Sequence, residues 1–214
     1  MQNKSSILKD AFALFMITLV AALALGFVNE ITKDPIARQK AKAKSEAYQT
    51  VYQEASMVDV ENEDIKSRVE TSEQFLADQG ITGATIDEAG IAKDANDNAI
   101  GYVMTITSKK GYGGDITFTM GYTADGMVTA IEILSMNETA GLGDRAKEDS
   151  FKGQFANKKV DSFNLTKSGA QAENDIDAIS SATVTSTAVT DAVNAGIAFA
   201  SDLLENKVGG VSHE

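Results

Sequence analysis

One stretch decides how the end of this chain folds: Asp177-Ala178-Ile179-Ser180-Ser181-Ala182-Thr183-Val184-Thr185-Ser186. The stretch is rich in serine and threonine. The apolar residues that follow it recur at helical spacing, at Val189, Val193, Ile197 and Ala200. The hydroxyls are therefore expected in the first turn of a C-terminal helix or just before it. Free backbone N–H groups and the positive end of the helix dipole suit a phosphate there. On the residues alone, an anion site and an ordinary helix cap at Ser180 or Ser181 both stay open.

The order Asp177-x-x-Ser180-x-Ala182-Thr183 resembles the sequence by which flavin transferases recognise their targets. In such targets the final threonine carries FMN through a phosphoester bond, and Thr183 takes that place here. Ser181 stands where the family usually has glycine, which restricts its backbone. Ser180, Ser181 and Thr185 are then candidate neighbours of the phosphate.

A second motif lies upstream: Asn137-Glu138-Thr139-Ala140-Gly141-Leu142-Gly143, followed by Phe151-Lys152-Gly153-Gln154-Phe155. It resembles the Glu-Thr-Pro-Gly-Leu-Gly loop of the RnfG family. RnfG proteins belong to the Rnf complex, a membrane-bound ferredoxin:NAD oxidoreductase that pumps sodium ions or protons. The related NqrC proteins, from a sodium-pumping NADH:quinone oxidoreductase, have a similar loop. Ala140 replaces the family proline, so φ is fixed less firmly. Residues 111–116 and the turn Asp125-Gly126 also look like this family, and the resemblance extends to about residue 205.

The resemblance implies an α+β fold: an N-terminal transmembrane helix, then one FMN-binding domain with an antiparallel sheet flanked by helices. It further implies that Glu138, Thr139, Gly141, Leu142 and Gly143 lie near the flavin, with Leu142 packing on it and Tyr112 close by. Without the resemblance, the leucine would be read as core, the tyrosine as a cross-strand filler and the glycines as turn residues.

The implied function is that of a membrane-anchored electron-transfer subunit with covalent FMN, which is not catalytic alone. It would relay electrons within a ferredoxin:NAD oxidoreductase complex coupled to sodium or proton translocation. The expected partners are the other subunits of the complex, the membrane, and a flavin transferase that modifies the chain during maturation, because the sequence offers no paired base for self-modification. A membrane-anchored sensor or assembly module without electron transfer is the alternative, and covalent flavin distinguishes the two.

Composition excludes several other classes. The net charge of −12 speaks against a nucleic-acid partner, which needs clustered Lys and Arg. The absence of cysteine excludes thiolate-ligated iron–sulfur clusters, Cys-based zinc sites, disulfides and a lipoprotein anchor. The single histidine, His213, lies in a Gly-rich tail that cannot hold a base or a metal ligand in place. We predict no metal site and no catalytic residue.

Residues 11–28 form an uncharged apolar run of 18 residues. At ~1.5 Å per residue the run spans about 27 Å, just enough to cross the hydrocarbon layer of a bilayer. A cleaved signal peptide, with Ala22-Leu23-Ala24 as its cleavage pattern, stays open as an alternative. Basic residues after the run outnumber those before it, so positive-inside counting alone places the domain in the cytoplasm. Because long domains translocate largely regardless of flanking charge, and because the family's flavin domain is outside, we expect a single-pass protein of the cell membrane with an extracytoplasmic domain.

We expect four segments: residues 1–32 with the transmembrane helix, 33–80 as a helical linker and domain entry, 81–206 as the FMN-binding domain, and 207–214 as a tail. Asp34 and Pro35 are predicted to begin a new helix that runs to about Ala55. Its apolar face is interpreted as packing against the domain, with a partner-binding stripe as the alternative. The segment from Met57 to Gly80 is predicted to be surface helix and loop.

Strands are predicted after that segment, with turns between them. Their ranges are 84–91, 100–107, 115–122 and 127–134. Residues 94–98 superficially suggest a calcium loop, but a hairpin turn fits better because the glycine and the bidentate glutamate of such a loop are missing.

A second threonine, Thr85, follows a Gly-Ala pair that matches the Gly-Ala-Thr core of the flavin motif more closely than Thr183 does. Its nearest upstream acid, Asp78, is one residue too far away. A strand carrying Asp87 and Glu88 follows, and these carboxylates would repel a phosphate. We therefore assign the flavin to Thr183.

Overall fold

The first element is a single long helix, α1 (Lys4–Val51). The computed structural model describes residues 4–211, with side chains from Ile7 onward, so His213 lies outside the described residues. The predicted new helix at Pro35 is wrong, because this proline lies inside α1. Proline removes one helical hydrogen bond at a cost of ~3 kcal/mol, and here strong helix formers follow it directly from Ala37 to Ala47.

The chain divides into two compact units, one ending at Ala43 and one beginning at Lys44. Among the described residues, one helix is long and apolar enough to cross a membrane, within Ile7–Val51, and its most apolar window has a mean hydropathy of 2.6. No residue of that window is buried by other described parts of the protein. An apolar helix without protein cover matches the expected membrane segment.

The second unit is built on a five-stranded antiparallel sheet with the strand order β1-β2-β3-β4-β5. The strands are β1 (Met57–Asp59), β2 (Ala84–Lys93), β3 (Ala99–Ser108), β4 (Ile116–Thr123) and β5 (Val128–Ser135). The four predicted strands are confirmed, with ends shifted by no more than two residues. β1 was missed because its three residues are too few to show an alternating pattern.

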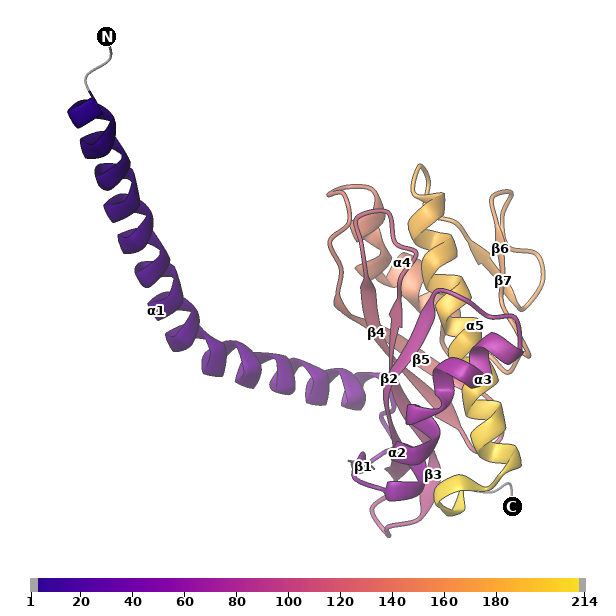
Figure 1. Ribbon diagram of the computed structural model, residues 1–214. Helices are drawn as coiled ribbons and strands as arrows, with labels where there is room; N and C mark the ends of the chain where they lie inside the picture. Colours follow the sequence, from indigo (N-terminus) through magenta and orange to yellow (C-terminus); the bar gives the residue numbers. More distant parts are fainter. Residues whose placement is uncertain (1–3, 212–214) are drawn as a thin grey trace. The chain divides into compact units, whose positions relative to one another are not determined.

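One face of the sheet packs against α5 (Thr183–Glu205), which lies along it in Figure 1. Its apolar side chains meet those of the inward-facing positions of β3 and β4, among them Met104, Ile106, Phe118 and Met120. The short helices α2 (Glu63–Glu70) and α3 (Ser72–Asp78) extend the same core. The expected antiparallel sheet flanked by helices is therefore confirmed.

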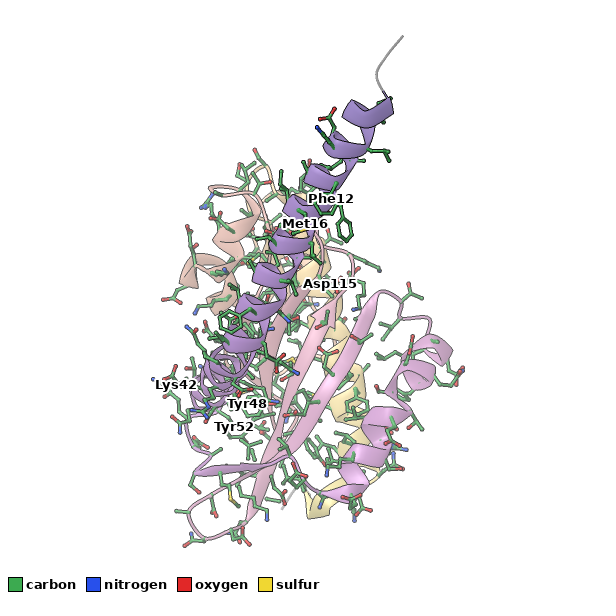
Figure 2. The ribbon with its side chains drawn as sticks, turned by 60° about the vertical axis from the view of Figure 1, so that its left-hand side comes forward. Phe12, Met16, Lys42, Tyr48, Tyr52 and Asp115 are labelled. Carbon is green, nitrogen blue, oxygen red and sulfur yellow. The ribbon has the colours of Figure 1, made fainter. Side chains whose placement is uncertain are left out.

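The opposite face of the sheet receives the last turns of α1. Tyr48, Val51 and Tyr52 are buried there against Ala92 and Val103, and Figure 2 shows the two tyrosines where α1 meets the sheet. The Tyr48 hydroxyl donates to Glu88 Oε1 at 2.8 Å and lies 3.0 Å from Thr105 Oγ1. Burial raises the pKa of Tyr48 above its usual value. The predicted packing of this helix face against the domain is confirmed.

The remaining elements follow β5 and lead back to α5. They are the 3₁₀ helix η1 (Gly143–Lys147), α4 (Asp149–Lys152), the 3₁₀ helix η2 (Gly153–Phe155), β6 (Asn164–Thr166) and β7 (Asp175–Asp177). β6 and β7 form a separate parallel pair. Because β7 ends at Asp177, it delivers the hydroxyl-rich segment directly to the start of α5.

Candidate functional site

The hydroxyl-rich segment is a tight turn fastened to α5 by a buried serine. The Ser186 hydroxyl accepts from the Ile179 N–H at 2.9 Å and donates to the Ala182 carbonyl at 3.0 Å. Ser181 adopts a left-handed conformation, with φ of 64°. This conformation turns the chain so that α5 begins at Thr183.

The N-terminus of α5 keeps its backbone donors. Ala182 is the residue that caps the helix, and it has no side-chain acceptor for the N–H groups of the first turn. The N–H groups of an uncapped first turn lack intrahelical acceptors and carry the positive end of the helix dipole. The interpretation of Ser180 or Ser181 as an ordinary cap is therefore wrong. The first-turn N–H groups that an anion site requires are present.

Glu138 connects this helix end to two loops that are distant in the sequence. Its Oε1 accepts from the Gly113 N–H at 3.1 Å, and its Oε2 accepts from the Thr185 hydroxyl at 2.9 Å. The carboxylate thus joins the second motif to the first turn of α5 and to the loop at residues 111–114, which we call the glycine-rich loop.

Three glycines allow the close approach around this carboxylate. A Cβ atom on Gly143 would lie 2.6 Å from both Glu138 Oε2 and Thr185 Oγ1. A Cβ on Gly111 would lie 2.8 Å from Glu138 Oε1, and one on Gly113 would collide with the Asn137 carbonyl oxygen. Packing therefore requires glycine at positions 111, 113 and 143.

A groove of about 530 Å³ opens where these segments meet. It is lined by Tyr112, Glu138, Thr139, Leu142, Gly143, Ser181, Ala182, Thr183, Val184 and Thr185. The structure thus brings together most of the residues proposed from the sequence. Ser180 is exposed and does not line the groove. Gly141 does not line it either, and its φ of 76° instead forms the turn of the second motif.

The lining of the groove combines polar and apolar side chains. Hydroxyls of Ser181 and Thr183 lie at the start of α5, and the hydrophobic side chains of Tyr112, Leu142 and Val184 remain 75%, 40% and 52% exposed. Within residues 4–211 no Lys or Arg lines the groove, so a bound phosphate would rely on hydroxyl and backbone donors. A volume in the usual range of ligand sites, about 300–1,000 Å³, with both hydroxyl and apolar lining fits a phosphate-bearing ring cofactor such as FMN.

Two supporting residues escaped the sequence interpretation. Gln154 Oε1 accepts from the Asp177 N–H at 2.7 Å, and its amide nitrogen donates to the Asp177 carbonyl oxygen at 3.3 Å, so it holds the end of β7. Ser186 holds the turn, as described above. Both residues occur within the quoted motifs, and this was the only sign in the sequence that they matter. The sequence does not show which groups their side chains contact.

The competing threonine lies elsewhere. Thr85 is in β2, where its hydroxyl donates to Asp87 Oδ1 at 2.9 Å. The same carboxylate accepts from Thr107 at 2.5 Å. Thr85 does not line the groove, and it lies within a strand rather than at a helix N-terminus.

Comparison with known proteins gives the class of the chain. The FMN-binding domain family matches residues 111–198, which include the glycine loop, both motifs and most of α5. This is a protein with an FMN-binding domain. A model of the RnfG N-terminal region matches residues 1–51, a range that includes α1.

Full-length relatives define the family. The G subunit of the proton-translocating ferredoxin:NAD(+) oxidoreductase complex of Clostridium ljungdahlii is 32% identical over 196 residues, covering 88% of this chain and 92% of the relative. The G subunit of the Na(+)-translocating complex of Acetobacterium woodii is 33% identical over 201 residues, covering 89% and 90%. The chain belongs to the RnfG family. Among solved structures, NqrC of Shewanella oneidensis is 21% identical with a TM-score of 0.48, over 54% of this chain and 60% of that one.

Proposed function

We propose that this protein is a membrane-anchored electron-transfer subunit that carries FMN in a phosphoester bond to Thr183. It would relay electrons between other subunits of an ion-translocating ferredoxin:NAD oxidoreductase complex. One observation carries the proposal: the groove joins Thr183, at the uncapped start of α5, to Leu142 of the second motif. The relatives are named as subunits of such complexes, which supports the proposal.

Different groups of the groove would bind the phosphate and the ring of the cofactor. The first-turn N–H groups of α5 and the Ser181 hydroxyl would bind the phosphate, with Ser180 near the turn. Thr185 lines the groove beside them, but its one hydroxyl proton is donated to Glu138. Leu142, Val184 and Tyr112 would pack against the ring and exclude water from it. Glu138 keeps the two loops against α5. When bound, FMN supplies the transfer of one or two electrons.

The attachment step requires a second protein. Among the described residues, no group forms a hydrogen bond with the Thr183 hydroxyl, and the nearby Glu138 carboxylate is already bonded to Thr185 and Gly113. A threonine hydroxyl is a weak nucleophile without an adjacent base. We therefore propose that a flavin transferase supplies the base and modifies Thr183 during maturation.

The proposed location is the cell membrane, with α1 as a single anchor and the flavin domain outside the cytoplasm. The length and apolar composition of α1 support the anchor. The orientation follows from the family resemblance and from the tendency of long domains to translocate largely regardless of flanking charge.

The test compares two threonines in the same chain. Thr183→Val keeps the β-branched shape and removes the hydroxyl, so coexpression with a flavin transferase should give a folded chain without covalent flavin on a denaturing fluorescent gel. Thr85→Val is the matched control and should retain full fluorescence. Persistent fluorescence in the Thr183→Val chain would falsify the assignment, and a wild-type chain that acquires no covalent flavin would favour a sensor or assembly module.

A further inference from the structure

Three basic side chains of α1 lie just beyond its apolar run: Lys33, Arg38 and Lys40. All three are exposed. In the part of the chain that the structure describes, none of them forms an ion pair or a hydrogen bond through its side chain. Cations of this kind are available to a ligand outside the protein.

Their distances from the apolar run place Lys33 in the polar layer of a membrane, and Arg38 and Lys40 within the electric field of its headgroups. At ~1.5 Å per residue, Lys33 lies about 7.5 Å beyond Val28, and Arg38 and Lys40 lie about 15 and 18 Å beyond it along the helix. The headgroup layer is roughly 5–8 Å thick on each side, and the field of charged headgroups extends about 8–10 Å further at moderate salt. Long Lys and Arg side chains also extend back toward the interface. All three therefore lie within reach of headgroup charge.

The distribution of charge along the chain points to the same partner. Between the apolar run and the domain, residues 29–44 hold five basic and two acidic side chains, whereas residues 45–214 hold 12 basic and 28 acidic ones. Positive charge is thus concentrated beside the apolar run in a chain that is otherwise strongly anionic. An anionic domain has no attraction of its own for an anionic membrane surface, so any such attraction resides in this segment.

We propose that Lys33, Arg38 and Lys40 bind the phosphate groups of anionic phospholipids in the leaflet on the domain's side of the membrane. The inference rests on the membrane anchoring proposed above and holds for either orientation of the domain. It also gives a role to basic residues that positive-inside counting would place in the cytoplasm, because attraction to headgroups does not depend on which leaflet they occupy.

The absence of native cysteine allows a direct measurement of the lipids around this segment. The full chain with Gln39→Cys, labelled with a donor dye, is reconstituted into vesicles of equal phosphatidylglycerol and phosphatidylcholine. Energy transfer to trace tail-labelled lipid of each kind then gives the local ratio of the two. We expect phosphatidylglycerol to be enriched about fivefold, and the enrichment to vanish in ~1 M salt, where screening reaches only about 3 Å.

Two triple variants separate local from total charge. Lys33→Gln/Arg38→Gln/Lys40→Gln should lower the ratio to that of the bulk vesicle. The control Lys147→Gln/Lys159→Gln/Lys167→Gln makes the same change in total charge at exposed positions of the domain and should leave the enrichment intact.

Flotation with neutral vesicles after an alkaline wash reports the anchor independently. If the chain floats but shows no enrichment, or if the enrichment survives the first triple substitution, the lipid inference is wrong and the membrane anchor is still supported. The basic residues would then be expected to bind an acidic surface on another protein of the complex. A chain that fails to float contradicts the anchoring on which the inference rests.

Discussion

At the scale of single residues, the left-handed conformation of Ser181 turns the chain so that α5 begins at Thr183, and this conformation costs free energy. Its φ of 64° lies in the left-handed region, which disfavours residues with a Cβ atom by about 1–2 kcal/mol relative to glycine. The sequence motif has glycine at this position in related targets, and the observed backbone explains why glycine suits it. Serine in place of glycine at position 181 therefore affects the conformation of the turn, and it does not remove the hydrogen-bond donors near Thr183.

Replacing this serine gives a prediction with a matched control. Ser181→Gly should stabilise the detergent-solubilised chain by about 0.5 kcal/mol, because relief of strain exceeds the added freedom of glycine in the unfolded chain. Asn157→Gly, at a φ of 55°, should gain less, since asparagine tolerates this region. Urea unfolding followed by tyrosine fluorescence measures both, as the chain has no tryptophan. Equal effects, or a loss at Ser181, would contradict the account of strain.

Glu138 shows where residue-level prediction stops. The sequence identified it as part of a motif and suggested a position near the flavin. Its hydrogen-bond partners, Gly113 and Thr185, lie 25 and 47 residues away. Only the tertiary fold brings such positions together, so its structural role in joining two loops to α5 could not be predicted from spacing.

At the scale of elements, the second motif must approach the first turn of α5 closely. Gly143→Ala would place a Cβ 2.6 Å from Glu138 Oε2 and from Thr185 Oγ1, so we expect a loss of about 1–3 kcal/mol in unfolding free energy. Gly153→Ala is the control: its backbone is helical and no described atom lies within 4 Å of the new Cβ, so it should be neutral or slightly stabilising. Urea unfolding of the two variants provides the comparison. A Gly143→Ala chain as stable as the control would show that the loop moves away without cost.

The elements that the sequence predicted are the long ones. Strands β2 to β5 run for eight to ten residues between recognisable turns, and α5 repeats its apolar positions over 23 residues. β6 and β7 have three residues each and exist because the chain pairs them in space. Pro35 misled the prediction for a different reason, since one missing hydrogen bond does not end a helix with strong helix formers beside it.

At the scale of the whole molecule, the sequence contains opposing signals about orientation. The basic residues that follow the apolar run favour a cytoplasmic domain by simple counting. The length of the chain beyond the run weakens the influence of these charges, and the family resemblance favours an extracytoplasmic domain. Binding of the same basic residues to anionic headgroups, as proposed above, would remove the conflict, because they would then be retained for contact with lipid.

Two single cysteines in the otherwise cysteine-free chain decide between the orientations. Ser168→Cys lies at an exposed position of the domain, and Lys9→Cys lies at an exposed position before the apolar run. With an extracytoplasmic domain, a membrane-impermeant maleimide should label Ser168→Cys in intact spheroplasts and Lys9→Cys only after permeabilisation. The reverse pattern would place the domain in the cytoplasm, where the positive-inside rule puts it. Labelling of both positions without permeabilisation would contradict a single membrane span, because the two residues must lie on opposite sides if α1 crosses the bilayer.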